Sequence, residues 1–128
     1  MIEDKIIASD FDGVIADSAA IEEVWRDEYI DKVLPKFEVL ELLEDGTIDI
    51  ILTGRRDVSW VRRWLDKWVK SWHGRIICAL SPGDKKRFLE QYDVDVMITD
   101  RDVWYDELVE WRDETGKLLV VVNEEVRT

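Results

Sequence analysis

Five short apolar runs, separated by stretches with helical spacing, limit most strongly how this chain can fold. The runs are KIIASDF, IDIILTG, RIICAL, VDVMITD and KLLVVV. Each is apolar at consecutive positions rather than at alternate ones, which is typical of strands that are buried on both faces. Because helical stretches separate them, such strands form a mostly parallel sheet with helices on both sides. We therefore expect a three-layer α/β/α fold with a mostly parallel five-stranded sheet.

Helical spacing is found in five stretches, at about residues 18–29, 37–46, 57–72, 84–92 and 102–116. Gly46, Gly74 and Gly116 stand where three of these helices should end. The chain has 128 residues and no linker or low-complexity segment, so we expect residues 1–128 to form a single domain. No apolar run reaches the ~18 residues of a membrane span and no signal-peptide pattern opens the chain. We therefore expect a cytoplasmic protein without a membrane partner.

The charge of the chain is unevenly distributed. Its net charge of −12 argues against nucleic acid as a partner of the molecule as a whole. Residues 53–87, which we name the basic block, nevertheless contain ten Lys and Arg and three Asp, a local charge of +7 that leaves −19 for the remainder. Because this block is locally positive, the negative net charge does not exclude a partner that carries phosphate.

Polar residues follow the ends of several predicted strands. In parallel α/β sheets, ligands bind outside the carboxyl ends of the strands, so these residues should surround one site. The candidates are Asp10, Asp12, Gly13, Thr53, Gly54, Arg55, Asp100 and Lys85, with Lys86 as the alternative to Lys85.

The aspartates of this set predict phosphoryl-transfer chemistry. Three carboxylates around one point need a hard cation, and Mg²⁺ combines carboxylates with waters and phosphate oxygens. Asp10 would then remain ionised and act as a nucleophile that forms an aspartyl-phosphate. Asp12 would reach the leaving-group oxygen as general acid and later serve as the base for water. Taken alone, an Asp-x-Asp-Gly stretch fits a capped turn equally well; the other strand ends favour the metal site.

Thr53 and Lys85 would complete a site for a phosphoryl group. Thr53 would hydrogen-bond a phosphoryl oxygen, and Lys85 would offset the charge of nucleophile and phosphate together. Gly13 would let the backbone approach the phosphate closely. Lys85 is favoured over Lys86 by its spacing from the apolar residues of the same helix, and a solvated helix start is the alternative reading of Lys85.

Four segments resemble the motifs of the haloacid dehalogenase (HAD) superfamily. DFDGVIADS resembles motif I, ILTGR resembles motif II, Lys85 its motif III lysine, and VMITDRD its acidic motif IV. The resemblance implies a Rossmann-like HAD fold and a hydrolase of the phosphatase type. It also implies that Asp10 is the nucleophile, that Asp12 is the acid/base, and that Mg²⁺ is bound by Asp10, the Asp12 backbone carbonyl and Asp100.

Within this superfamily, the chain is similar to the polynucleotide kinase 3′-phosphatase and RNA-repair-like branch through TGRR and YDVDVMITDRDVWYDELVEWR. In that branch an Arg after the motif II Ser/Thr contacts the substrate, which implies substrate binding by Arg55. Gly54, between Thr53 and Arg55, is also expected to bind substrate. The motif IV tripeptide of the branch is Asp-Asp-Arg, and here Thr99 replaces its first Asp. Arg101 is the Arg of this tripeptide and could hold Asp100 in place.

The spacing between the motifs leaves no room for a sizeable cap domain. Thr53 lies 40 positions after Gly13, and Asp84 lies 31 after Thr53. The expected open site suits a nucleotide or nucleic-acid end phosphate. The alternatives are a small-metabolite phosphatase closed by oligomerisation, hence a homo-oligomer, and a non-catalytic phosphate-binding or interaction domain. Asp102 and Asp106 are interpreted as a helix cap and an exposed helical face rather than as metal ligands.

Four tryptophans lie four residues apart in the predicted helix at 57–72 and form a stripe with its aliphatic residues. They are Trp60, Trp64, Trp68 and Trp72. The main interpretation is that this stripe packs on the sheet while the cations of the helix face water. Two alternatives remain: Trp60 stacks a nucleic-acid base near the active edge, or the stripe forms a dimer interface.

Overall fold

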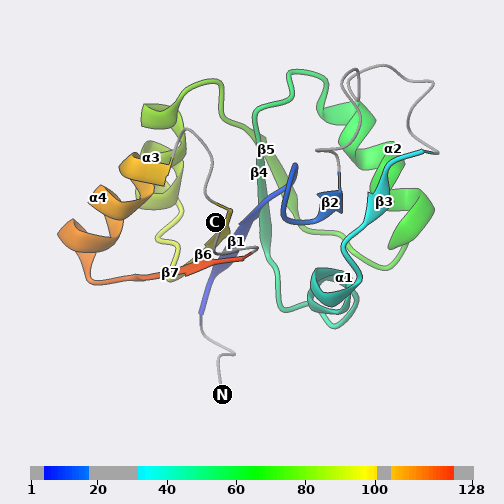
Figure 1. Cartoon of the computed structure of the whole chain (residues 1–128), viewed down its shortest axis with the longest axis horizontal. Helices are drawn as coiled ribbons and strands as arrows, with labels where there is room; N and C mark the ends of the chain where they lie inside the picture. The colour runs from blue at the N-terminus through cyan, green and yellow to red at the C-terminus, as the bar shows by residue number, and fades with distance from the viewer. Residues whose placement is uncertain (1–4, 18–31, 101–104, 123–128) are drawn as a thin grey trace, which may run out of the picture.

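The computed structural model describes residues 5–17, 32–100 and 105–122 (Figure 1). In this part of the chain no helix is both long and apolar enough to cross a membrane. The helix expected at 18–29 lies outside the described residues. The strands are β1 (Ile7–Asp10), β2 (Ala16–Asp17), β3 (Leu34–Pro35), β4 (Ile50–Thr53), β5 (Arg75–Cys78), β6 (Val96–Thr99) and β7 (Leu118–Val121), and the helices are α1 (Phe37–Glu44), α2 (Val58–Trp68), α3 (Pro82–Gln91) and α4 (Tyr105–Thr115).

Five strands form one parallel sheet in the order β5-β4-β1-β6-β7. The predicted five-stranded parallel sheet is therefore confirmed, and its architecture is compatible with a Rossmann-like fold. The chain runs outward from β1 through β4 to β5 and then crosses back to β6, so the strand order reverses beside β1. In open α/β sheets, such a reversal creates a crevice outside the carboxyl ends of the strands. Strand β1 ends there with Asp10.

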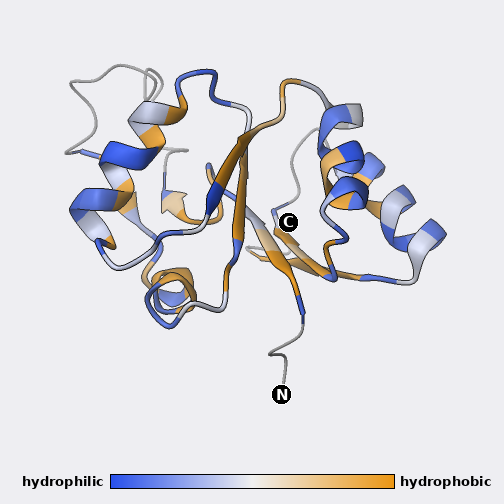
Figure 2. Ribbon diagram, turned by 180° about the vertical axis from the view of Figure 1, so that it is seen from behind, coloured by the Kyte–Doolittle hydropathy of each residue, from blue (hydrophilic) through white to orange (hydrophobic). Residues whose placement is uncertain are grey.

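Helices α1 and α2 cover one face of the sheet, and α3 and α4 cover the other, as expected for three layers (Figure 1). Successive residues of β1 face opposite layers: Ile7 packs with α1 and α2, and Ala8 packs with α3 and α4. Figure 2 shows the central strands as mostly apolar and the helices as mixed, with polar residues between apolar ones. This distribution explains why the strand sequences are apolar at consecutive positions.

Helix α2 is shorter than its sequence pattern predicts. It ends at Trp68, and Trp72 lies beyond it with its ring buried, donating from its indole N–H to a backbone carbonyl at 2.7 Å. Gly74 therefore does not end this helix, contrary to the expectation. Gly116 does follow α4 directly, and Gly46 follows α1 after the cap residue Asp45, with φ values of +71° and +79°.

A short antiparallel pair, β2 with β3, was not expected from the sequence. It follows a tight loop after β1, in which the Phe11 carbonyl accepts hydrogen bonds from the N–H groups of Ile15 at 2.9 Å and Ala16 at 3.0 Å. The loop contains Asp12 and Gly13. Its closure fixes the backbone of these two residues beside the end of β1.

Candidate active site

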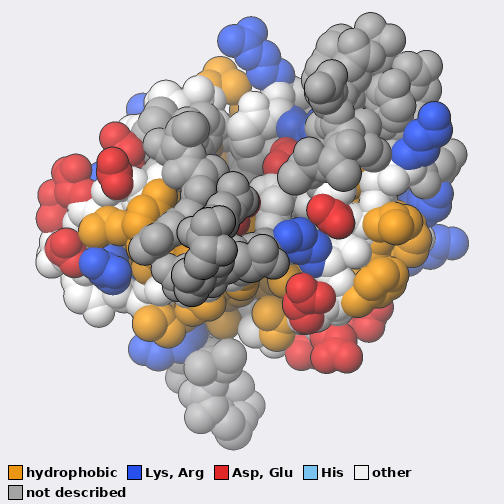
Figure 3. Space-filling view, in the orientation of Figure 1, with side chains coloured by type: hydrophobic (Ala, Val, Ile, Leu, Met, Phe, Trp, Pro, Cys, Tyr) orange, Lys and Arg blue, Asp and Glu red, His pale blue; other side chains and the backbone are white. Residues whose placement is uncertain are grey.

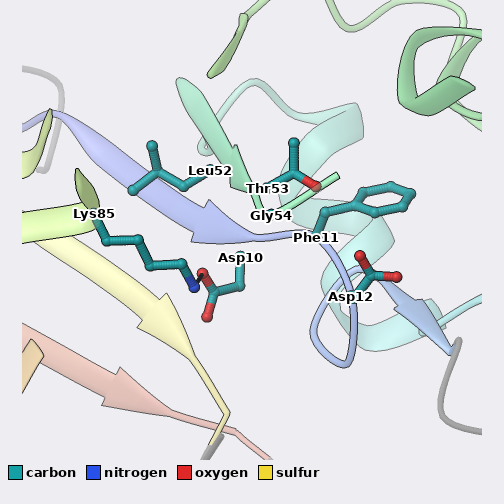
Figure 4. A pocket seen from close by; sticks show the side chains of 7 residues that line it. All are labelled: Asp10, Phe11, Asp12, Leu52, Thr53, Gly54 and Lys85. Atoms are coloured by element: carbon teal, nitrogen blue, oxygen red, sulfur yellow. Dashed lines mark hydrogen bonds and ion pairs between the residues drawn. The ribbon is translucent and has the colours of Figure 1, made fainter. Parts of the chain in front are cut away.

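A pocket of about 180 Å³ opens at the carboxyl edge of the sheet (Figure 4). The end of β1, the end of β4 and the start of α3 together supply its walls. The lining residues are Asp10, Phe11, Asp12, Leu52, Thr53, Gly54 and Lys85. Five of them are candidates from the sequence, so the expected convergence of separate segments on one point is present in the structure.

Asp10 and Lys85 form a buried ion pair at the floor of this pocket. The Lys85 Nζ lies 2.5 Å from Asp10 Oδ1, and only 3% of Asp10 and 4% of Lys85 are exposed. The Thr99 hydroxyl donates to the other carboxylate oxygen, Asp10 Oδ2, at 2.5 Å. Two donors therefore fix both oxygens of Asp10. A buried carboxylate needs such partners, because burying a lone charge is costly.

The structure distinguishes the two neighbouring lysines. Lys86 points to α4, where its Nζ lies 2.6 Å from Glu110 and 2.9 Å from Glu114. Hydrogen bonds to these two glutamates raise the pKa of Lys86, and the bond from Lys86 lowers the pKa of Glu110. Lys85 lies four residues before the buried Leu89, on the inner face of α3. Only Lys85 lines the pocket.

Asp12 is held by Arg55 rather than placed beside Asp10. The Arg55 Nη2 donates to Asp12 Oδ1 at 2.8 Å and its Nε donates to Oδ2 at 3.0 Å, which is a bidentate geometry. The Arg55 guanidinium also lies over the ring of Trp60, 4.4 Å from its centre. Figure 4 shows the Asp10 side chain next to Lys85 and the Asp12 side chain on the other side of the pocket. The expectation of three carboxylates around one point is therefore wrong.

Thr53 ends β4 and is almost completely buried, with 2% exposed. Its Oγ1 accepts a hydrogen bond from the Arg55 backbone N–H at 3.1 Å. A hydroxyl that accepts in this way keeps its proton for a different acceptor. The next residue, Gly54, is exposed and lines the pocket. Thr53 can therefore donate to a ligand that enters beside Gly54.

The sequence did not anticipate the neighbour of Gly13. This residue has a φ of +82°, and a Cβ built on it would lie 3.1 Å from Asp100 Cγ and in collision with Asp100 Oδ2. Its N–H donates to the Ala16 carbonyl at 2.9 Å. The absence of a side chain at Gly13 thus makes room for Asp100, and Gly13 is not among the residues that line the pocket. The expected contact between Gly13 and phosphate gains no support from this geometry.

The donors at this edge of the sheet fit Mg²⁺ in their chemistry. Asp10 and Asp100 are carboxylates, and Asp100 lies against the backbone that follows Asp12, whose carbonyl is the third expected ligand. Mg²⁺ is usually held by one or two carboxylates together with waters and substrate oxygens. In residues 5–17, 32–100 and 105–122, no three His, Cys, Asp or Glu side chains group as a metal site. Two carboxylates and one carbonyl therefore remain the candidate ligand set.

The tryptophan stripe belongs to the core. Trp60, Trp64 and Trp72 are 1%, 0% and 4% exposed, while Trp68 is half-buried. Trp60 packs edge-on against Phe11 with ring centres 6.2 Å apart. Stacking of a nucleic-acid base on Trp60 is therefore wrong, and so is a dimer interface built on the buried rings. The main interpretation from the sequence is confirmed.

The role of Thr99 was not predicted from the sequence. There Thr99 is only a departure from the acidic tripeptide, whereas in the structure its hydroxyl donates to Asp10, the expected nucleophile. Its position at the end of β6 was the available signal, since each strand end at this edge contributes to the site. Arg101 and Asp102 lie outside the described residues, and Asp106 is exposed in the first turn of α4, as expected.

No protein-family model and no curated protein sequence matches this chain. The resemblance to the HAD superfamily consequently remains a prediction that rests on the motifs.

Proposed function

We propose that this protein is a Mg²⁺-dependent phosphohydrolase of the HAD superfamily, which cleaves phosphomonoesters through an aspartyl-phosphate on Asp10. The observation that carries the proposal is the buried Asp10–Lys85 pair at the floor of a pocket that Asp12 and Thr53 also line. A structural ion pair has no need of a pocket, and a phosphate-binding domain has no need of a second carboxylate at its rim. Together these features favour catalysis.

The proposed reaction uses groups that already lie in the pocket. An Asp10 oxygen attacks phosphorus, the bond to the leaving oxygen breaks, and Asp12, which takes part in this step as the carboxylic acid, gives that oxygen its proton and becomes the carboxylate. Water then attacks the phosphorus of the aspartyl-phosphate and Asp12 accepts a proton from it, which releases phosphate and regenerates Asp10. Lys85 offsets negative charge throughout, and Thr53 donates its hydroxyl to a phosphoryl oxygen. Bound Mg²⁺ would add charge neutralisation for the phosphoryl oxygens, held by Asp10, Asp100 and the Asp12 carbonyl.

Two substrate classes remain open for this chemistry, and the basic block bears on the choice. Several of its cations are engaged inside the molecule: Arg55 with Asp12, Lys85 with Asp10, and Lys86 with two glutamates of α4. Exposed Lys and Arg side chains gather along the right-hand edge of Figure 3, on the side where α2 lies. Because Trp60 is buried and the cations of the basic block nearest the pocket are paired with carboxylates, we favour small phosphomonoesters over nucleic acid as the substrate class. An oligonucleotide end is the second candidate.

The test is Mg²⁺-dependent phosphate release from three substrates in parallel. These are a 3′-phosphorylated oligonucleotide, a 5′-mononucleotide and an aryl phosphate, each assayed with Mg²⁺ and with a chelator. Asp10→Asn serves as the control, and its circular dichroism spectrum verifies that it folds. We expect turnover of at least one small ester that is lost in Asp10→Asn. Phosphate binding without turnover of any substrate would favour the non-catalytic alternative, and preference for the oligonucleotide would identify an end-processing enzyme.

A further inference from the structure

The observed contacts of Arg55 differ from its expected role. A contact with substrate phosphate was expected, yet its guanidinium binds both carboxylate oxygens of Asp12. The side chain of Arg55 is only 10% exposed, whereas 39% of the Asp12 side chain is exposed. The guanidinium is thus mostly buried, while the carboxylate that it binds is more exposed.

The protein core fixes this arginine from two sides. Its guanidinium lies 4.4 Å from the ring centre of Trp60, a side chain that is 1% exposed and packs against Phe11. Its backbone N–H donates to Thr53 Oγ1 at 3.1 Å. Stacking on a buried indole and a bonded backbone leave the guanidinium little freedom to turn toward a ligand.

We propose that Arg55 is a positioning residue, which holds the Asp12 carboxylate at the leaving-group side of the pocket and does not bind substrate phosphate. This inference rests on the proposed function, because it concerns the proton that Asp12 transfers. A general acid must lie within hydrogen-bond reach of the leaving oxygen. Two parallel hydrogen bonds from the planar guanidinium, which we call its fork, fix both the position and the rotation of a carboxylate. The stacked Trp60 ring in turn holds the guanidinium in place.

The inference has a kinetic consequence that separates it from a role in binding. Loss of the fork should slow the reactions that need a proton on the leaving oxygen and affect the others far less. Benzyl phosphate releases an alkoxide that needs this proton, while 4-nitrophenyl phosphate releases a stable phenolate. A residue that binds phosphate would instead act on both esters alike, since they share the same phosphoryl group.

The first experiment measures kcat and KM of wild type, Arg55→Met, Arg55→Lys, Asp12→Asn and Asp12→Asn/Arg55→Met with both esters. For Arg55→Met we expect kcat on benzyl phosphate to fall by roughly 10- to 100-fold, because a displacement of about 1 Å can cost a hundredfold. The loss on 4-nitrophenyl phosphate should be much smaller and KM should change little. In the Asp12→Asn background, Arg55→Met should add no further loss.

Arg55→Lys is the matched variant, since it keeps the charge and most of the stem but loses the fork. We expect it to resemble Arg55→Met on benzyl phosphate. Recovery of activity by lysine would show that only the charge matters and would overturn the inference. Equal losses on the two esters, or additive losses in the double variant, would overturn it as well. If wild type shows no Asp10-dependent turnover, the proposed function fails, and the inference falls with it.

A second measurement does not depend on turnover. The affinity for inorganic phosphate, measured by isothermal titration calorimetry, should be the same within about twofold in wild type and Arg55→Met, since positioning of Asp12 contributes no bond to phosphate. A tenfold or greater loss of affinity in Arg55→Met would show that the arginine binds phosphate and would contradict the proposal. The same titration on Arg55→Lys reveals whether charge alone changes the affinity.

Discussion

Removing the ammonium group of Lys85 should destabilise this protein strongly, although lysines are usually surface residues. Lys85→Met keeps most of the side-chain length and leaves Asp10 without its closest cation, which now lies at 2.5 Å. Both residues are at least 96% buried. The Thr99 hydroxyl would remain as a donor to Asp10, but a neutral donor does not compensate a buried charge.

The size of the effect follows from the burial of the pair. Removing one partner of a buried ion pair typically costs about 3–5 kcal/mol of unfolding free energy, because the other charge is left uncompensated. In a chain of this size each kcal/mol moves the melting temperature by roughly 3–5 °C. Lys85→Met should therefore melt about 10–20 °C below wild type. Differential scanning calorimetry at neutral pH measures this directly.

Two control variants make the reasoning refutable. Lys86→Met removes the neighbouring ammonium, whose glutamate partners are exposed and screened by salt, so its melting temperature should change far less. Asp10→Asn/Lys85→Met removes both charges and should be more stable than Lys85→Met alone. If Lys85→Met melted like Lys86→Met, or if the double variant were the least stable, the buried pair would not have the energetic role assigned to it.

Three further outcomes are expected. Trp64→Ala should lose about 3–5 kcal/mol in urea unfolding, because the ring is fully buried and its N–H donates to the Val33 carbonyl at 2.8 Å. Thr99→Val should lower kcat roughly tenfold or more by removing the bond to Asp10 Oδ2; unchanged kinetics would contradict this role. Hydrogen bonds from the Ile6 N–H and from Lys117 hold the pKa of Asp95 below its usual value of 3.8, so the ionised form of Asp95 stabilises the fold above that pH. Asp95→Asn should therefore lower the melting temperature at neutral pH. The difference from wild type should shrink as the pH falls below 3.8.

The sequence predicted the sheet well because hydrophobic burial alone determines it. Strands covered by helices on both faces must be apolar at consecutive positions, and five such runs allow few other arrangements. Parallel strands end at one edge, so the same pattern also placed Asp10, Thr53 and Lys85 near one another without any knowledge of contacts. The end of α2 was predicted less well. Trp72 is buried by tertiary packing and donates to the Ile48 carbonyl, and the periodicity of the sequence does not contain such contacts.

The partner of Arg55 could not be predicted for a different physical reason. Two residues past the end of β4, an arginine of this length can reach either a phosphate in the pocket or the carboxylate of Asp12, and both are anions. The choice depends on where the loop after β1 carries Asp12, which is 43 positions away in sequence. It also depends on a flat surface for the guanidinium, and the core residue Trp60 supplies it. Trp60, which the sequence predicts mainly to pack on the sheet, therefore also lies against the guanidinium that binds Asp12.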